Sequence, residues 1–231
     1  MQLLANLEDF FGFVHKWFGV PNGSFALPAS ALPAKLPHSL EALYLQLGSL
    51  TMEGGPLAKP GSAPFNNQDC IYAPEQLVFA DGQVEFASEN QHNWSARCPA
   101  TGADPAVSLN WGWMVESDTL PRLYPHRPIG APLSDFLVTI GLQELVFHGH
   151  SKRRAIDPGG FAGARRNNES VPITDVPVWT KHNFMNCADW GDRPDNEPSH
   201  SFYMSKDGEI LAFYQGDEPS GWYALRSDAR R

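Results

Sequence analysis

LVFADGQVEFASENQHNW, residues Leu77–Trp94, is the stretch that decides the fold. Two short runs of alternating side chains, 77–80 and 83–88, flank Asp81-Gly82. An Asp-Gly pair favours a type I′ turn because both central residues of that turn need positive φ. In the second run Val84, Phe86 and Ser88 would face one side, and Glu85, Ala87 and Glu89 the other. The stretch therefore predicts a β-hairpin.

The end of this hairpin is unusually polar, because Glu89, Asn90 and Gln91 follow one another and Trp94 comes soon after. Buried amides and carboxylates are tolerated when hydrogen-bond partners are supplied. We therefore expect the three polar side chains to tie the strand to a loop, with Trp94 covering them. A catalytic role for Glu89 is the alternative.

Three segments repeat apolar residues every three or four positions, which is typical of amphipathic helices. The first is 3–18, which would either pack on its own core or detach to bind a partner. The second is Leu36–Gly48, where Pro37 suits a first turn and Gly48 a left-handed C-terminal position. The third is 132–148, for which Ser134 is the expected N-cap.

Glu144 falls inside the apolar stripe of the third helix, which consists of Leu133, Phe136, Leu137, Ile140 and Phe147. A carboxylate there must be paired or hydrogen-bonded, or its pKa rises. We expect Glu144 to anchor a neighbouring backbone segment or an arginine; a functional acid is the alternative. The opposite helix face is also apolar, so this helix should be covered on both sides.

The remaining segments complete a single predicted domain over 1–231. Residues 1–34 would form the N-terminal helix and its connector, and 35–148 the core, with 49–69 as an exposed loop. Glycine and charge patterns predict a mobile loop over 149–170. A second hairpin at Asp207-Gly208 favours a β-meander extension over 171–231. The predicted fold is α+β, with a central, mainly antiparallel twisted sheet and helices packed against it.

The net charge, the cysteine content and the hydrophobic pattern of the chain disfavour several classes of function. The chain of 231 residues has a formal net charge of −9, which disfavours nucleic-acid binding because phosphate contacts need a basic surface. Three dispersed cysteines fit a reducing compartment. Neither a signal peptide nor a run of transmembrane length is apparent, so we expect a cytoplasmic protein without membrane contact.

No catalytic motif stands out in the sequence, and we expect no enzymatic activity, cofactor or metal. His148 and His150 with Glu144 form only a weak metal-ligand pattern. The most interaction-like segment is an acidic loop around one tryptophan, and the residues predicted there to bind a partner are Asp189, Trp190, Asp192, Asp195 and Glu197. Aromatic anchors with a charged rim are typical of binding surfaces, and a merely solvated loop is the alternative.

Four segments in order resemble the SUKH superfamily, which includes a yeast cell-wall-assembly regulator and many bacterial immunity proteins. They are LPHSLEALYLQLG (36–48), FASENQHNW (86–94), Asp104-Pro105 and LSDFL (133–137) with Glu144. The motif residues are Leu36, Pro37, Tyr44, Gly48, Phe86, Glu89, Asn90, Gln91, Trp94 and Glu144. The spacing to Trp94 departs slightly from the family pattern, and the residues after 148 lie outside it.

The resemblance implies an α+β fold and a non-catalytic role. Similar proteins neutralise a toxin by binding it or act as scaffolds. We therefore expect an immunity protein that binds a cognate toxin domain, with basic nucleases as one suitable class. The alternatives are a regulatory scaffold with several weak partners and a metal-dependent hydrolase that uses Glu144, His148 and His150. The toxin's identity, the contact surface and the oligomeric state stay open.

Overall fold

The computed structural model describes residues 4–58, 63–91, 94–111, 126–148, 164–166, 169–171, 178–182, 198–205, 207–215 and 222–226. Its α-helices are α1 (Leu7–Phe18), α2 (His38–Leu47) and α3 (Leu133–His148). Short 3-10 helices cover Ala29–Ala31, Gly48–Thr51 and Pro74–Gln76. The strands are β1 (Asp69–Ile71), β2 (Val78–Ala80), β3 (Gln83–Glu89), β4 (Trp94–Pro99), β5 (Ala106–Trp111), β6 (Arg127–Pro132), β7 (Ala164–Arg166), β8 (Glu169–Val171), β9 (Trp179–His182), β10 (Pro198–Met204), β11 (Ile210–Gln215) and β12 (Trp222–Leu225).

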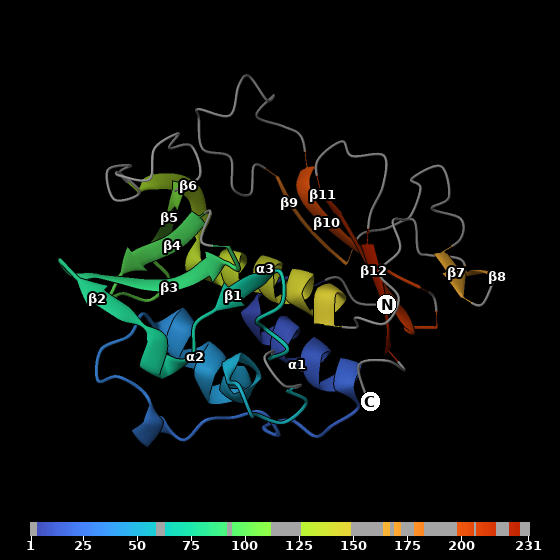
Figure 1. Ribbon diagram of the computed structural model, residues 1–231, viewed down its shortest axis with the longest axis horizontal. Helices are drawn as coiled ribbons and strands as arrows, with labels where there is room; N and C mark the ends of the chain where they lie inside the picture. Colours follow the sequence, from blue (N-terminus) through green and yellow to red (C-terminus); the bar gives the residue numbers. More distant parts are fainter. Residues whose placement is uncertain are drawn as a thin grey trace.

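The strands form antiparallel sheets, so the predicted α+β fold is confirmed. One sheet has the order β1-β3-β4-β5-β6, with β2 also paired to β3, and a second has the order β12-β11-β10-β9. The second sheet is the predicted C-terminal meander, and it is separate from the first. Helix α3 lies between the two sheets, with α1 and α2 beside it (Figure 1). This central position explains why nearly all of α3 is buried, as its two apolar faces predicted.

The Asp81-Gly82 hairpin is confirmed. Asp81 has φ 50° and Gly82 φ 74°, as a type I′ turn requires, and Ala80 pairs with Gln83 across the turn. The register of β3 against β4 shifts between Glu85 and Ala87. Such a bulge bends the strand and alters which side chains share a face.

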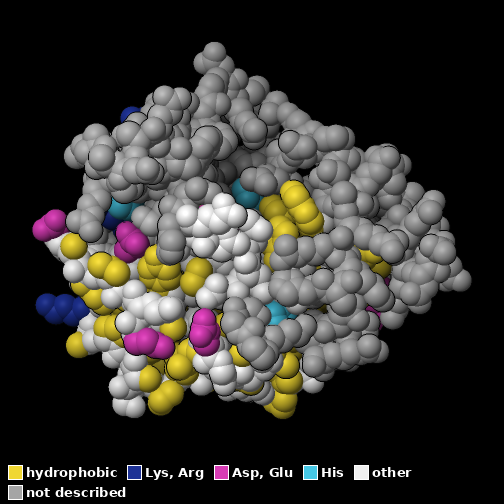
Figure 2. Space-filling model, in the orientation of Figure 1, with side chains coloured by type: hydrophobic (Ala, Val, Ile, Leu, Met, Phe, Trp, Pro, Cys, Tyr) yellow, Lys and Arg dark blue, Asp and Glu magenta, His cyan; other side chains and the backbone are white. Residues whose placement is uncertain are grey.

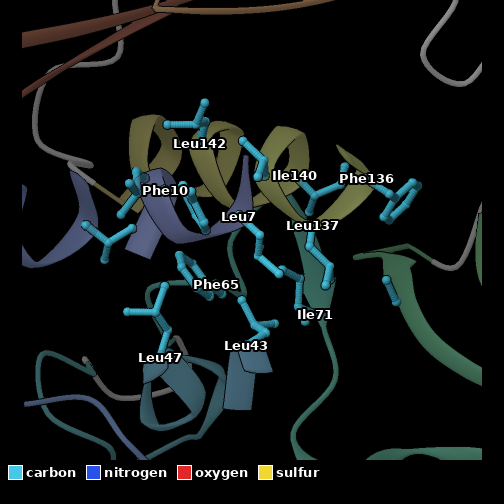
Figure 3. Close-up of a cluster of buried hydrophobic side chains, with 14 of the residues drawn as sticks. Leu7, Phe10, Leu43, Leu47, Phe65, Ile71, Phe136, Leu137, Ile140 and Leu142 are labelled. Atoms are coloured by element: carbon cyan, nitrogen blue, oxygen red, sulfur yellow. The ribbon is translucent and has the colours of Figure 1, made fainter. Parts of the chain in front are cut away.

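The hydrophobic core is built where the three helices meet the first sheet and the segment before it (Figure 3). Phe10 of α1 stacks on Phe65 with ring centroids 6.2 Å apart, and Phe86 of β3 meets Phe136 of α3 edge to face at 5.5 Å. Side chains from α1, α2 and α3 all point into this cluster; the labelled members are Leu7, Phe10, Leu43, Leu47, Phe65, Ile71, Phe136, Leu137, Ile140 and Leu142.

Helix α1 packs on its own chain, which favours the first of the two interpretations of residues 3–18. Asn6 caps its N-terminus by accepting the N–H of Asp9, and Gly19 ends it with φ 71°. The guanidinium of Arg226, beyond β12, donates to the carbonyl of Trp17 (3.0 Å) and to that of Lys16. Arg226, which directly follows β12, therefore supplies hydrogen-bond donors to carbonyls in the last turn of α1.

The cap of α3 differs from the prediction. Helix α3 begins at Leu133, so Ser134 lies inside it and the predicted N-cap role for Ser134 is wrong. Instead Asp104, from the loop before β5, accepts the Ser134 N–H (2.7 Å) and hydroxyl (2.6 Å), and also the Ser39 hydroxyl of α2 (2.8 Å). One carboxylate thus satisfies donors at the N-termini of two helices, where its negative charge is favourable.

Two predictions around the end of α2 are also wrong. Gly48 has φ −59° and continues into a 3-10 helix, so it is not left-handed. A Cβ at Gly48 would lie 2.6 Å from Leu27 Cδ1, which explains the glycine by close packing. The segment 49–69 is not simply an exposed loop, because Leu50 and Phe65 are buried in the core.

Within the predicted loop 149–170, the structure places the antiparallel pair β7–β8 at 164–166 and 169–171, so these residues pair as strands. Strand β6 was not predicted, since the sequence around Arg127–Pro132 contains two prolines and a glycine. None of the helices in the described ranges has both the length and the apolar character that a membrane crossing needs.

Candidate functional site

Glu144 is held by a row of backbone donors that we call the Glu144 cradle. Its Oε2 accepts the N–H groups of Asn67 (2.6 Å) and Gln68 (3.1 Å), and its Oε1 accepts the N–H of Asp69 (2.9 Å). The Glu144 side chain is fully buried. Three consecutive N–H groups suit an ionised carboxylate, since each bond to a charged acceptor is stronger than a neutral one. The predicted backbone anchor is therefore confirmed.

A second carboxyl group lies beside the cradle. Asp69 is buried, and its Oδ2 accepts a hydrogen bond from the Gln143 amide. Asp69 also pairs with Glu89 across β1 and β3, so that three acidic residues lie near one another at this end of the sheet. Glu89 is buried as well, and its Oε2 accepts the Gln91 N–H at 2.7 Å.

The polar end of β3 ties the strand to the segment before β1, as predicted. The Asn90 N–H donates to the Gln68 carbonyl at 3.2 Å, and the Asn90 amide donates to the Asn67 carbonyl at 3.3 Å. Trp94 is buried and meets Phe136 edge to face with ring centroids 6.3 Å apart. The segment 67–69 is thus fastened on one side to α3 through Glu144 and on the other to β3.

Burial and neighbouring negative charges raise the pKa values of Asp69 and Glu144. Burial raises the pKa of Asp69 from 3.8 to about 7; the Gln143 hydrogen bond opposes this shift, and the Glu89 carboxylate adds to it. Burial also raises the pKa of Glu144, the Asp69 charge adds to the shift, and the three cradle N–H groups act against it. The pKa values of both acids therefore lie above the range of exposed carboxyl groups.

A polar chain on the other face of the first sheet was not singled out from the sequence. The Tyr72 hydroxyl donates to Glu85 (3.4 Å), the Ser95 hydroxyl donates to Glu85 (3.1 Å), and Ser95 Oγ lies 3.3 Å from His126 Nε2. Burial, with a smaller effect of Arg97, lowers the pKa of His126 to about 4, so His126 is neutral at neutral pH. The alternation along β3 and β4 places Glu85 and Ser95 on this face, but nothing in the sequence brings His126 to them.

The edge strand β2 carries exposed apolar side chains. Val78 is 54% exposed and Phe79 45%, and within the part of the chain that the structure describes these are the exposed large hydrophobic residues. Acidic residues lie close to them, since Glu75 precedes β2, Asp81 follows it, and Glu85 pairs with Val78 across the hairpin. On the side of the molecule where β2 lies, Figure 2 shows hydrophobic atoms beside acidic side chains.

Comparison with known proteins does not assign a role to these sites. No family model, curated protein or solved structure matches this chain. The resemblance to the SUKH superfamily therefore rests on the four sequence segments alone.

The structure gathers some of the predicted motif residues and separates others. Tyr44 is buried in the core and its hydroxyl donates to the Tyr72 carbonyl at 2.7 Å. Leu36 packs against the core, and Pro37 directly precedes α2. The other motif residues lie around the turn from β3 to β4. Phe86 and Glu89 belong to β3, Asn90 and Gln91 directly follow it, and Trp94 begins β4. The residues predicted to bind a partner, Asp189, Trp190, Asp192, Asp195 and Glu197, lie outside the described residues.

The weak metal-ligand pattern is not assembled in the described part of the chain. Glu144 accepts backbone N–H groups with both oxygens, and the buried His148 ring meets Phe18 edge to face at 6.3 Å. His150 lies outside the described residues. Among those that are described, no three His, Cys, Asp or Glu side chains come together as a metal ion would require.

The Asp69→Asn variant is expected to change how stability depends on pH. Because Asp69 has a pKa of about 7 in the folded protein against 3.8 normally, the folded state keeps a proton that the unfolded state releases. The parent therefore loses stability as pH rises from about 4 to about 7, by up to about 1.4 kcal/mol per pH unit. Asparagine cannot titrate and still offers an oxygen to Gln143. The unfolding free energy of the variant should thus rise relative to the parent across this range, then level off.

Chemical denaturation at a series of pH values measures this difference. Burial lowers the pKa of His126 to about 4 and that of His200 to about 3. Protonation of these histidines in acid destabilises the parent and the variant equally, so this effect cancels in the comparison. If the difference in unfolding free energy between variant and parent stayed constant from about pH 4 to about pH 8, the expected titration of Asp69 would be contradicted.

Proposed function

We propose that this chain is a non-catalytic protein-binding domain of the SUKH type that neutralises a cognate toxin by binding it directly. The observation that carries the proposal is the exposed apolar edge strand β2 with acidic residues around it. Exposed apolar residues that are gathered and rimmed by charge are typical of interaction surfaces. The side chains of Val78 and Phe79 alternate between the two faces of β2, because Val78 pairs with Glu85 and Phe79 with Val84. We call this exposed edge, with Glu75, Asp81 and Glu85, the β2 surface.

The charge of the β2 surface favours a basic partner. Glu75 and Asp81 are exposed and Glu85 is half-buried, and the chain has a net charge of −9. Complementary charge accelerates association, while a desolvated aromatic residue supplies much of the binding energy. A basic toxin domain, such as a nuclease domain, has the required chemistry. The acidic loop with Trp190 would extend the same charge complementarity, and its role stays a prediction.

The strongest acidic candidates from the sequence already have structural roles, which supports a non-catalytic function. The Glu144 carboxylate accepts three backbone N–H groups, and Glu89 accepts the Gln91 N–H. As part of the proposal the protein acts in the cytoplasm, with no cofactor and no direct contact with nucleic acid or membrane. A regulatory scaffold with several weak partners is the alternative.

The test is co-purification and affinity measurement with the toxin domain encoded next to this protein. We expect one stoichiometric complex, rescue of growth on co-expression, and an association rate that falls as salt is added. Phe79→Thr keeps a β-forming residue in β2 but removes the ring, so it should weaken binding about 30-fold, the loss typical of an interface hot spot.

Arg127→Thr, on strand β6 at the opposite edge of the same sheet, is the matched control and should bind like the parent. A tight complex that Phe79→Thr leaves unchanged would place the interface elsewhere and contradict the role of β2. If co-expression did not rescue growth and no complex formed, toxin neutralisation would be contradicted. Many substoichiometric partners instead of one would favour the scaffold.

A further inference from the structure

A groove of about 480 Å³ runs along α1, away from the β2 surface. One wall is α1 itself, from Glu8 to Trp17. The other is formed by residues that follow more than 160 positions later, namely Val178, Met204, Asp207, Gly208 and Arg226. Cavities of several hundred Å³ are the usual size of small-molecule sites. This groove is not visible in the sequence, because its two walls come from segments far apart in the chain.

The α1 wall of the groove contains a glycine that no neighbouring side chain requires. Gly12 lies in the middle of α1, where glycine costs about 1 kcal/mol relative to alanine. A Cβ at Gly12 would meet no heavy atom within 4 Å, so no neighbouring residue needs its absence. What the missing side chain leaves is open space in the groove. An occupant that uses this space would explain a residue that otherwise only weakens the helix.

The walls are apolar and aromatic. Phe13 and Trp17, one turn apart on α1, are stacked with ring centroids 6.3 Å apart and planes at 11°. Leu4, Val178 and Met204 complete the apolar lining. Aromatic faces attract cations as well as apolar groups, because the ring face is electron-rich.

Among the described residues that line the groove, carboxylates outnumber basic groups by three to two. Glu8 and Asp9 lie in the first turn of α1 and Asp207 on the opposite wall. The Arg226 guanidinium is directed at backbone carbonyls and lies 3.7 Å from Glu209, which offsets its charge. Lys16 lies on the last turn, roughly 12 Å along the helix from Glu8. The acidic end of the groove is therefore separated from the exposed ammonium of Lys16.

From these features we infer that the groove binds a small amphipathic amine, an aromatic or branched aliphatic group that carries one ammonium. The apolar group lies over Gly12 against Phe13 and Trp17, and the ammonium points to the Glu8 and Asp9 end. An anion of the same shape is disfavoured by the carboxylates. This site is independent of the proposed toxin-binding role.

The test compares phenethylamine with 3-phenylpropionate, two probes with a similar apolar body and opposite charge, on the full chain. Protein-observed NMR follows the amides of Gly12 and Gly208, which line the two walls. We expect saturable shifts at both amides with the amine and at least tenfold weaker binding of the acid. Shifts that do not saturate with the amine, or equal affinity for the two probes, would overturn the inference.

Two variants make the test specific. Gly12→Leu extends a side chain from the α1 wall into the groove and should weaken amine binding at least tenfold. The melting temperature should stay equal or rise, because leucine is the better helix former. Glu8→Lys should abolish the preference for the amine over the acid. Amine binding that survives Gly12→Leu unchanged, or a charge preference that survives Glu8→Lys, would place the probe elsewhere and overturn the assignment.

Discussion

Replacing Glu144 with alanine is expected to lower the free energy of unfolding by at least about 3 kcal/mol. The substitution removes the carboxylate that accepts three backbone N–H groups, those of Asn67, Gln68 and Asp69. Each buried donor left without an acceptor costs roughly 1–3 kcal/mol. The segment before β1 would also lose its attachment to α3, so loosening should reach Phe65 in the core.

Urea denaturation at neutral pH measures the loss. Glu144→Gln keeps the size of the side chain but turns one oxygen into a donor that faces another donor, so we expect an intermediate loss. Glu75→Ala, at an exposed carboxylate before β2, is the control and should change stability by less than about 0.5 kcal/mol. If Glu144→Ala were no worse than Glu75→Ala, the cradle would be incidental to the fold.

Gly141→Val is expected to destabilise the protein by about 3 kcal/mol, at the upper end of what overpacking costs. Gly141 of α3 faces Phe10 of α1, and a Cβ there would overlap the end of the Phe10 ring. The ring has little freedom to move, because it is fully buried and stacked on Phe65. Helices α1 and α3 would have to separate to accommodate the new side chain.

The matched control is Gly12→Val, the same change on α1 at a position where a Cβ meets no neighbour. Helix propensity changes equally in the two variants, so their difference in thermal or chemical unfolding isolates the packing effect. Phe10→Leu combined with Gly141→Val should recover part of the loss, which a double-mutant cycle would register as coupling of about 0.5–3 kcal/mol. Equal unfolding free energies for the two valine variants would contradict the close approach.

Local features of the fold were predictable because their physical causes are local. Asp81-Gly82 adopts positive φ whatever surrounds it, and the apolar periods of α1, α2 and α3 are visible in the sequence. The need of Glu144 for a partner followed from its place in an apolar stripe. The identity of that partner, the segment 67–69, did not, because 75 residues separate Glu144 from Asp69.

The wrong predictions share the opposite cause, a distant residue that changes a local preference. Ser134 was expected to cap α3, but Asp104 arrives from another loop and accepts its N–H. Gly48 was expected to be left-handed, but it is small because Leu27 lies against it. The groove along α1 depends on two ends of the chain, so no window of sequence contains it.

The hydrogen bond from Arg226 to the Trp17 carbonyl joins residues 209 positions apart. Helix α1 is translated before Arg226, so this donor at its C-terminal end is added 209 residues after Trp17. Contacts between residues this far apart in the sequence form slowly during folding. The buried face of α1 likewise waits for Phe65 and for α3, so the unfinished chain exposes apolar surface that the folded protein buries.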